Sequence, residues 1–285
     1  TGQLEFTDSD VTTPQMTAKM LGGNAAFSAA TENGQVRVRG QGVLKATEMD
    51  VWLGKPLASR LKGETGWRGE LSLGRDQTRL RLESSLAGME SRLPAPLEKG
   101  AASPTNLVYE YQKINLEEDW SSLQYGKMAS AVWTTRKTPG GRRFDRGELR
   151  FGGAARLPSE PGLQVAGYVR TIDLGGWMDL FPDARGGGLP LSGIQLTLSR
   201  LEFLGRPFHD ITLSGKLKGN LLRGSVNGRE MEGSLTYRLA GDAAARLSAL
   251  FRHFTLPEAG AGSGGEAVRI EAADLPAMDV QVEEL

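Results

Sequence analysis

Alternating apolar and polar residues are the main pattern in this chain. Leu71 and Leu73 alternate with polar residues, and beyond the turn-forming residues Gly74 to Gln77 the leucines Leu80 and Leu82 alternate with charged ones. A period of two residues is typical of a half-buried β-strand. The two stretches therefore predict an antiparallel hairpin with all four leucines on one face.

The same alternation recurs along most of the chain and predicts a fold that is almost entirely β. Further strands are expected near Val36 to Lys45, Leu163 to Arg170, Ile194 to Phe203, Ile211 to Lys218, Leu222 to Asn227 and Leu235 to Leu239. The segment Asp242 to Phe254 fits the spacing of a helix as well as that of a strand. Irregular segments are predicted at Arg92 to Asn106, Arg136 to Arg146 and Pro257 to Glu266.

Helical spacing is scarce. Thr171 to Phe181 predicts one short helix, in which Asp173 can cap the first turn and Pro182 ends the last. A second short helix is predicted where Leu53, Leu57 and Leu61 recur every four residues. The expected helical content is therefore a few short segments.

One phrase is repeated within the chain. The pattern Leu-Pro-x-x-x-(Ile/Val)-Gln-(Leu/Val) occurs at Leu189 to Leu196 and again at Leu275 to Val282. A shorter pattern, Gly-x-Leu-x-(Phe/Leu/Tyr), begins at Gly2, Gly69, Gly147 and Gly233. The longer repeat suggests a structural unit that stacks along an axis.

So many strands raise a problem of coverage. A dozen strands about 4.8 Å apart would make a sheet roughly 55 to 60 Å long with one apolar face. Two short helices cannot cover such a face. Either the sheet folds over on itself as a sandwich or barrel, or it curls into a trough whose apolar side meets something else. The residues alone leave both alternatives open.

Composition excludes several classes of function. Lys plus Arg and Asp plus Glu number 34 each, so no net charge favours nucleic acid or another polyanionic partner. The absence of cysteine excludes disulfides, thiolate catalysis and cysteine metal sites. No apolar run approaches the roughly 18 residues that span a bilayer. We expect the chain to be an excised fragment whose membrane anchor lies outside it.

No catalytic or metal-binding constellation is found in the sequence. His209 and His253 each stand alone, and Ser263 lacks the glycine spacing of a nucleophile elbow. The acidic run Glu117 to Asp119 is interpreted as a solvated edge. The arginines at 142, 143 and 146 form a small basic loop that could touch lipid headgroups. We expect no enzyme activity, no metal and no cofactor.

Several segments resemble one known family in their order along the chain. They are Gly2 to Asp8, Leu21 to Gly23, Gly63 to Trp67, Ser84 to Lys99, Gly147 to Pro158, Gly162 to Trp177, Leu189-Pro190 and Leu275-Pro276. Together they resemble the C-terminal region of the YhdP family of AsmA-like bacterial envelope proteins. The resemblance implies one elongated, curved, mostly antiparallel sheet over residues 1–285 that forms an apolar groove, and it favours a strand over Asp242 to Phe254.

The resemblance also implies a function. Such a groove would carry phospholipid acyl chains, without catalysis, in a periplasmic protein that is anchored in the inner membrane and moves phospholipid between inner and outer membrane. Other partners, in either membrane or among envelope proteins, would bind outside this fragment. The residues expected to line the groove are Val36, Val38, Leu71, Leu73, Leu80, Leu82, Leu149, Phe151, Leu163, Val165, Ile194, Leu196, Leu198, Ile211 and Leu213.

Two other functions stay open from the sequence. One is a structural β module that spans the periplasm or binds an envelope partner, with a closed core and no ligand. The other is a carbohydrate-active β sandwich, which would need paired carboxylates in a cleft, and the sequence offers no clear candidates for them.

Overall fold

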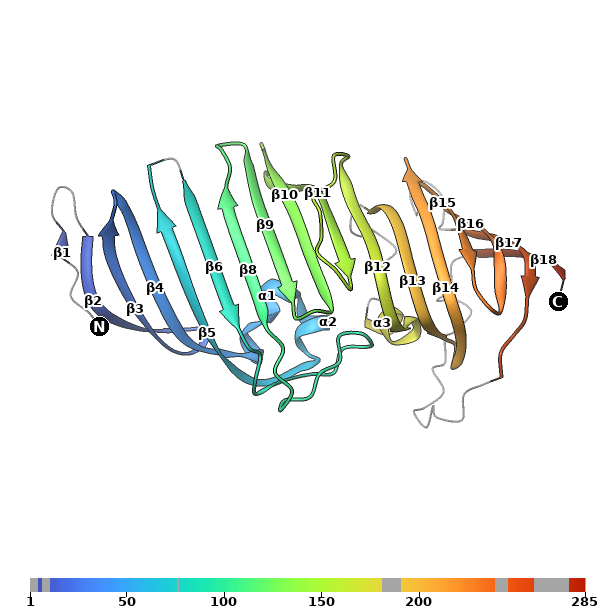
Figure 1. Ribbon diagram of the computed structural model, residues 1–285, viewed down its shortest axis with the longest axis horizontal. Coiled ribbons are helices and arrows are strands. Elements are labelled where there is room, and N and C mark those ends of the chain that lie inside the picture. Colours follow the sequence, from blue (N-terminus) through green and yellow to red (C-terminus); the bar gives the residue numbers. More distant parts are fainter. Residues whose placement is uncertain are drawn as a thin grey trace. The chain divides into compact units, whose positions relative to one another are not determined.

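The predicted fold class is confirmed. The computed structural model describes residues 5–6, 11–75, 77–180, 191–238, 246–258 and 277–284. Strands account for 68% of it and helices for 8%, and the sheet is mostly antiparallel and unclosed (Figure 1). By contacts, the chain divides into two compact units, which we describe separately. Unit 1 holds Thr1–Leu93, Leu97–Gly147 and Ala154–Ser159, and unit 2 holds Pro94–Pro96, Glu148–Gly153 and Glu160–Leu285.

Unit 1 is a sheet of consecutive antiparallel strands. In chain order its elements are β1 (Glu5–Phe6), β2 (Val11–Met20), β3 (Gly22–Glu32), β4 (Gln35–Lys45), η1 (Ala46–Glu48), α1 (Asp50–Leu53), α2 (Lys55–Ala58), β5 (Leu61–Leu73), β6 (Thr78–Ser84), β7 (Met89–Ser91), β8 (Leu107–Lys113), β9 (Glu118–Tyr125) and β10 (Ala129–Thr138). Each of β1 to β5 pairs with the next strand, β6 pairs with β8, and β8 to β10 follow in order. The short β7 pairs with the first residues of β5. The strand β11 (Gly141–Phe151) contributes residues to both units.

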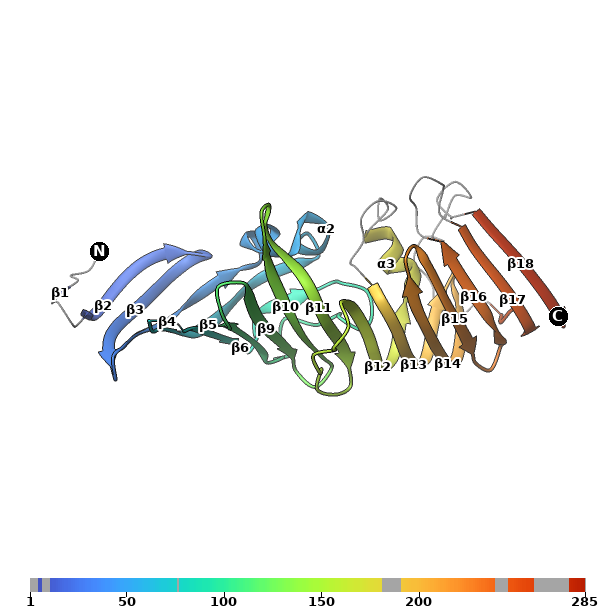
Figure 2. The same cartoon turned by 90° about the horizontal axis from the view of Figure 1, so that it is seen from above.

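Unit 2 contains β12 (Gly162–Asp173), α3 (Leu174–Leu180), β13 (Leu191–Phe203), β14 (Arg206–Lys218), β15 (Leu221–Asn227), β16 (Met231–Arg238), β17 (Arg246–Phe254) and β18 (Ala277–Glu284). The strands β13 to β17 are antiparallel neighbours in chain order. Two pairs are parallel, β12 with β13 and β17 with β18. Figure 2 shows α3 against one face of these strands.

The Leu-Pro repeat coincides with the two parallel pairs. Its described residues include Ile194 to Leu196 in β13 and Val280 to Val282 in β18, the second strand of each parallel pair. Parallel neighbours need a crossover connection, whereas antiparallel neighbours can be joined by a tight turn. The repeat therefore marks where the chain crosses over before the antiparallel order continues. Its leading Leu-Pro pairs, at 189–190 and 275–276, lie outside the described residues, as do Gly2, Gly186 to Gly188, Ser263 and the end of the predicted Pro257 to Glu266 loop.

The predicted hairpin is confirmed. Strands β5 and β6 pair antiparallel, and the Gly74 amide donates to the Gln77 carbonyl oxygen across the turn at 2.8 Å. The helix after Thr171 is confirmed as α3, whose Gly176 amide donates to Asp173 Oδ1 at 2.9 Å. The strand preferred within Asp242 to Phe254 is confirmed over the described residues of β17.

Two element predictions are wrong. Arg136 to Arg146 is not irregular, because β10 and β11 run through it on either side of a short turn. Its alternation was hidden because charged residues occupy both faces. The helix predicted from Leu53 to Leu61 is two single turns, α1 and α2, separated by Gly54 at φ 74°, and Leu61 begins β5 instead.

Candidate functional site

Cross-strand pairing places the predicted apolar residues of unit 1 on one face. Val38 lies opposite Leu71, which in turn lies opposite Leu80. Residues directly opposite each other point to the same side of a sheet, and so do residues two apart in a strand. The residues sharing this side, the apolar face of unit 1, include Val36, Val38, Leu71, Leu73, Leu80 and Leu82. The predicted register of the hairpin is therefore confirmed.

One row of this face crosses six strands without interruption. From Leu80 it continues through Tyr111 and Ser121 to Trp133. At the usual strand spacing, the row from Val38 to Trp133 is about 24 Å long. Its aliphatic members are half-buried, and Leu73 in the next row is 41% exposed. The row is thus extended and mostly apolar, and except at the buried Ser121 it is only partly covered.

One end of the apolar face of unit 1 is closed by local packing. Leu44, Ala46, Leu86 and Met89 form a buried cluster, against which Trp67 and other apolar side chains pack. The segment after β6 supplies part of this cover through Leu86 and through Met89, the first residue of the short strand β7. The helix α1 does not close the face with its largest side chains, because Val51 and Trp52 are exposed.

The opposite side of unit 1 is a network of ion pairs, which we call the polar face. Arg39 bonds to Glu32 and Glu70, and Arg81 bonds to Glu83 and Glu110. Hydrogen bonds from Arg68 and Arg81 lower the pKa of Glu83. A hollow of about 570 Å³ lies over this side and is lined by charged residues including Arg39, Arg68, Glu70, Arg81 and Glu83. The residues that alternate with the leucines therefore form a charged side of the sheet, opposite the apolar face.

Unit 2 also has an apolar face. Val165 lies beside Ile194, Leu196 lies opposite Leu213, and Leu198 lies opposite Ile211. Leu163 precedes Val165 by two residues in β12, and Leu149 precedes Phe151 by two in β11, where Phe151 packs against the same cluster. The structure therefore brings together seven of the predicted residues of this unit, which are Phe151, Val165, Ile194, Leu196, Leu198, Ile211 and Leu213. Leu149 and Leu163 are placed beside them only by strand alternation, and Leu163 lies at a register shift between β12 and β13.

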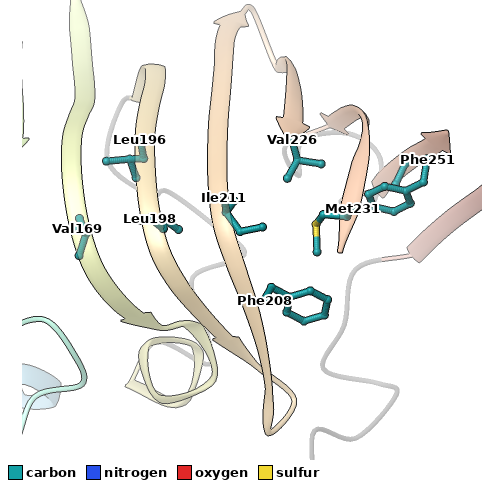
Figure 3. Close-up of a cluster of buried hydrophobic side chains, with 9 residues drawn as sticks. Val169, Leu196, Leu198, Phe208, Ile211, Val226, Met231 and Phe251 are labelled. Atoms are coloured by element: carbon teal, nitrogen blue, oxygen red, sulfur yellow. The ribbon is translucent and has the colours of Figure 1, made fainter. Parts of the chain in front are cut away.

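Burial on this second face is uneven. Leu196, Leu198 and Ile211 are 8%, 1% and 0% exposed and belong to the buried cluster drawn in Figure 3. Ile194 and Leu213, on the same two strands, are only half-buried. The first three side chains are core residues of this unit, so a ligand on this face would meet the half-buried residues first.

The helix α3 is held in place by contacts within unit 2. Trp177 Nε1 donates to the Ala95 carbonyl oxygen at 2.8 Å, and Leu180 is 5% exposed. The helix packs on β13, which carries Leu196 and Leu198.

The acidic run and the basic loop are joined in unit 1. Asp119, interpreted from sequence as solvated, is 4% exposed, and its Oδ2 lies 2.7 Å from Arg142 Nε. Glu118 points the other way and pairs with Arg146 at 3.1 Å. The interpretation as a solvated edge is wrong for Asp119, because strand alternation turns it to the apolar face. Sequence spacing could not reveal this pair, because its members lie on different strands.

His209 also has a partner that sequence spacing missed. Glu230 is 9% exposed and accepts hydrogen bonds from the His209 amide at 2.6 Å and from its Nδ1 at 2.8 Å. Burial alone would raise the pKa of Glu230, but these bonds outweigh burial and lower it. Among the residues that the structure describes, no group of three or more His, Cys, Asp or Glu residues could hold a metal ion.

Comparison with known proteins supplies the family. A family model described as YhdP protein matches residues 1–285. The chain belongs to the YhdP family. Neither the curated proteins nor the solved structures contain a match.

Membership places this YhdP-family chain among AsmA-like bacterial envelope proteins, which suggests a role related to lipid transport. YhdP is not a known enzyme family. In the described parts of the chain, no helix has the length and apolarity needed to cross a membrane.

Proposed function

We propose that this chain carries phospholipid acyl chains on its apolar faces, without catalysis, as a periplasmic segment of a protein that is anchored in the inner membrane elsewhere in its sequence. In this function the protein moves phospholipid between inner and outer membrane. The acyl chains slide along the apolar rows while the headgroups stay in water, so no covalent step or cofactor is needed.

The observation that carries the proposal is the half-buried row from Val38 to Trp133 in unit 1. A lipid tail spans half of the roughly 30 Å hydrocarbon core, or about 15 Å, and the row of about 24 Å can therefore contact its whole length. Each methylene group that leaves water for this row contributes about 0.8 kcal/mol. A tail that moves along this row stays out of water, so the free-energy cost of its transfer falls by about this amount for each methylene group in contact.

In this proposal, fewer of the predicted residues of unit 2 would contact lipid. Leu196, Leu198 and Ile211 stabilise the fold, because they are already buried among protein side chains. The half-buried side chains Val165, Ile194 and Leu213 are the ones that an acyl chain would contact there.

Photocrosslinking in cells tests the proposal. A photoreactive residue at Leu82, on the apolar face of unit 1, should crosslink to phospholipid, whereas one at Arg81, on the polar face, should not. The two positions are adjacent in β6 and differ only in the side they face, so Arg81 is a matched control. Equal crosslinking at both positions, or none at Leu82, would contradict an acyl chain on this face.

A charge in the row gives a second test. In Leu82→Glu the carboxylate can reach water, so the variant should fold but lose bound lipid. In Leu196→Glu the carboxylate is buried without a partner, which costs several kcal/mol and should unfold unit 2. Collapse of both variants, with no lipid crosslink in the parent chain, would favour the structural module.

The structural module remains the second candidate. The buried cluster of unit 2 favours it, since nine residues there pack against one another to 8% exposure or less. This function predicts lipid-independent folding and no bound lipid after extraction of the purified chain.

A further inference from the structure

Asp119 is an unexplained feature of the apolar face of unit 1. By register it lies beside Thr135 on β10 and opposite Lys113 on β8, one row from Tyr111. Its side chain is 5% exposed, and only Oδ2 is paired, with Arg142 Nε. The other oxygen, Oδ1, is buried and accepts no well-formed hydrogen bond, although the Tyr111 phenol lies near enough to the carboxylate to interact with it. Buried carboxylate oxygens are normally satisfied, so an unpaired one calls for a missing donor.

Arg142 offers the complementary charge at the same place. A guanidinium has five N–H donors, and here Nε binds Asp119 while one terminal nitrogen lies 3.5 Å from the Leu116 carbonyl oxygen. The side chain is 36% exposed. Arg142 therefore both covers the carboxylate and presents a cation toward solvent.

Aromatic side chains occupy the rows of the apolar face next to this pair. The rings of Tyr109 and Trp133 lie 6.2 Å apart, and the Tyr109 hydroxyl is 3.4 Å from Ser121 Oγ. Burial raises the pKa of the Tyr111 phenol, and the neighbouring Asp119 carboxylate raises it further. Tyrosine and tryptophan have an apolar body and a polar tip, which suits the boundary between hydrocarbon and water. Across the face, aliphatic residues thus give way to aromatic ones and then to an ion pair.

We propose that Asp119 and Arg142 form a headgroup site for a zwitterion that carries a primary ammonium and a phosphate, the chemistry of phosphoethanolamine. The ammonium donates to Asp119 Oδ1, and the phosphate accepts from the terminal nitrogens of Arg142. The pair is neutral in sum, so it favours a ligand with both charges over a net anion. The inference rests on the proposed function, which brings the lipid tail to the adjacent aromatic and aliphatic row.

Ligand binding to the chain tests the site. The probes are short-chain phosphatidylethanolamine, phosphatidylcholine and phosphatidylglycerol with identical tails, and free O-phosphoethanolamine, each titrated calorimetrically. The ethanolamine lipid should bind roughly tenfold more tightly than the choline lipid, whose quaternary ammonium has no N–H to donate, because a charged hydrogen bond is worth about this factor. Free phosphoethanolamine should compete weakly, which distinguishes a lipid site from a site for the soluble ion.

Substitutions at Asp119 and Arg142 test whether these two residues cause the preference for the ethanolamine lipid. Asp119→Asn should lower ethanolamine-lipid binding to the level of the choline lipid, and Arg142→Gln should weaken all three lipids together. Glu118→Gln is the matched control, since it removes a neighbouring carboxylate that pairs on the opposite side. Thermal melting checks that each variant folds. If a variant does not fold, the comparison of the three lipids on the parent chain still tests the headgroup site.

The outcomes separate this inference from the proposed function. Equal affinity for all three lipids, with affinity that grows with tail length, would overturn the headgroup site and leave the acyl row standing. Tighter binding of free phosphoethanolamine than of the lipid would also overturn it in favour of a soluble ligand. Absence of binding at every tail length would contradict both.

Discussion

Arg142 Nε lies 2.7 Å from Asp119 Oδ2, and this pair joins strands β9 and β11 on the apolar face of unit 1. The sequence shows no sign of this contact, because the acidic run is interpreted there as a solvated edge and the arginines as a separate basic loop. Pairing of β8, β9 and β10 turns Asp119 to the same side as Tyr111 and Trp133. The consequence is a buried carboxylate one row away from the aromatic residues of this face.

The first prediction concerns the stability of this pair. Arg142→Gln leaves a buried carboxylate without its cation and should lower the free energy of unfolding by about 1 to 3 kcal/mol, the cost of an unsatisfied buried group. Arg229→Gln breaks a pair with Asp210 whose side chains are 67% and 63% exposed, and should cost less than about 1 kcal/mol. Urea unfolding of both variants measures the difference. Equal losses would mean that Asp119 is solvated in solution.

The second prediction concerns the core of unit 2. Ile211 is 0% exposed and packs in the cluster with Leu198 and Phe208, so Ile211→Ala should cost about 2 to 5 kcal/mol. Leu213, two residues along the same strand, is half-buried, and Leu213→Ala should cost clearly less. Denaturant midpoints give the comparison. A larger loss at Leu213 would show that the cluster lies elsewhere on the face.

The third prediction concerns backbone contact between β11 and β12. Gly167 has φ 111°, and a Cβ there would lie 2.0 Å from the Phe151 carbonyl oxygen. Gly167→Ala should therefore destabilise the chain by about 1 to 3 kcal/mol, the usual cost of a strained backbone position. Gly140→Ala is the control, because a Cβ at Gly140 meets nothing within 4 Å. A neutral Gly167→Ala would argue against this close approach.

The fourth prediction concerns acid stability. Bonds from His209 lower the pKa of Glu230 below the ordinary value for a glutamate, so Glu230 stabilises the folded state above the unfolded pKa. This contribution is lost as pH falls through the lower, folded pKa. Glu230→Gln should be less stable than the parent at neutral pH, and its stability should fall less between pH 6 and 3, values chosen to bracket an ordinary carboxyl pKa of about 4.3.

Urea midpoints across that range measure the slope. Glu258→Gln removes an exposed carboxylate of unit 2 and should leave the slope nearly unchanged. Parallel curves for Glu230→Gln and the parent would show that the His209 bonds do not depress this pKa.

Several features followed directly from local sequence. The alternation around Leu71 and Leu80 predicted the hairpin, its register and its apolar side, because a two-residue period assigns every side chain to a face. Asp173 predicted the start of α3, because a cap acts on the amides next to it in sequence. Both results depend only on near neighbours in the chain.

Other features depended on distant residues and could not be predicted in this way. The strands around Arg136 and Arg146 carry charges that find partners on neighbouring strands, so their polarity hid the alternation. The Glu230 partner of His209 comes from a loop after β15, and the parallel pairing that the Leu-Pro repeat marks is invisible in the repeat itself.

The sequence by itself determined the β class of this protein, the faces of its clearest strands and its family resemblance. The first two depend on the two-residue alternation of apolar and polar residues, and the third depends on the order of short segments along the chain. Only the tertiary structure decided which apolar residues are core residues and which are half-buried. Leu196 and Leu213 have the same alternation and lie opposite each other, yet one is buried and the other is not. Burial depends on what packs above a face, and those neighbours come from elsewhere in the chain.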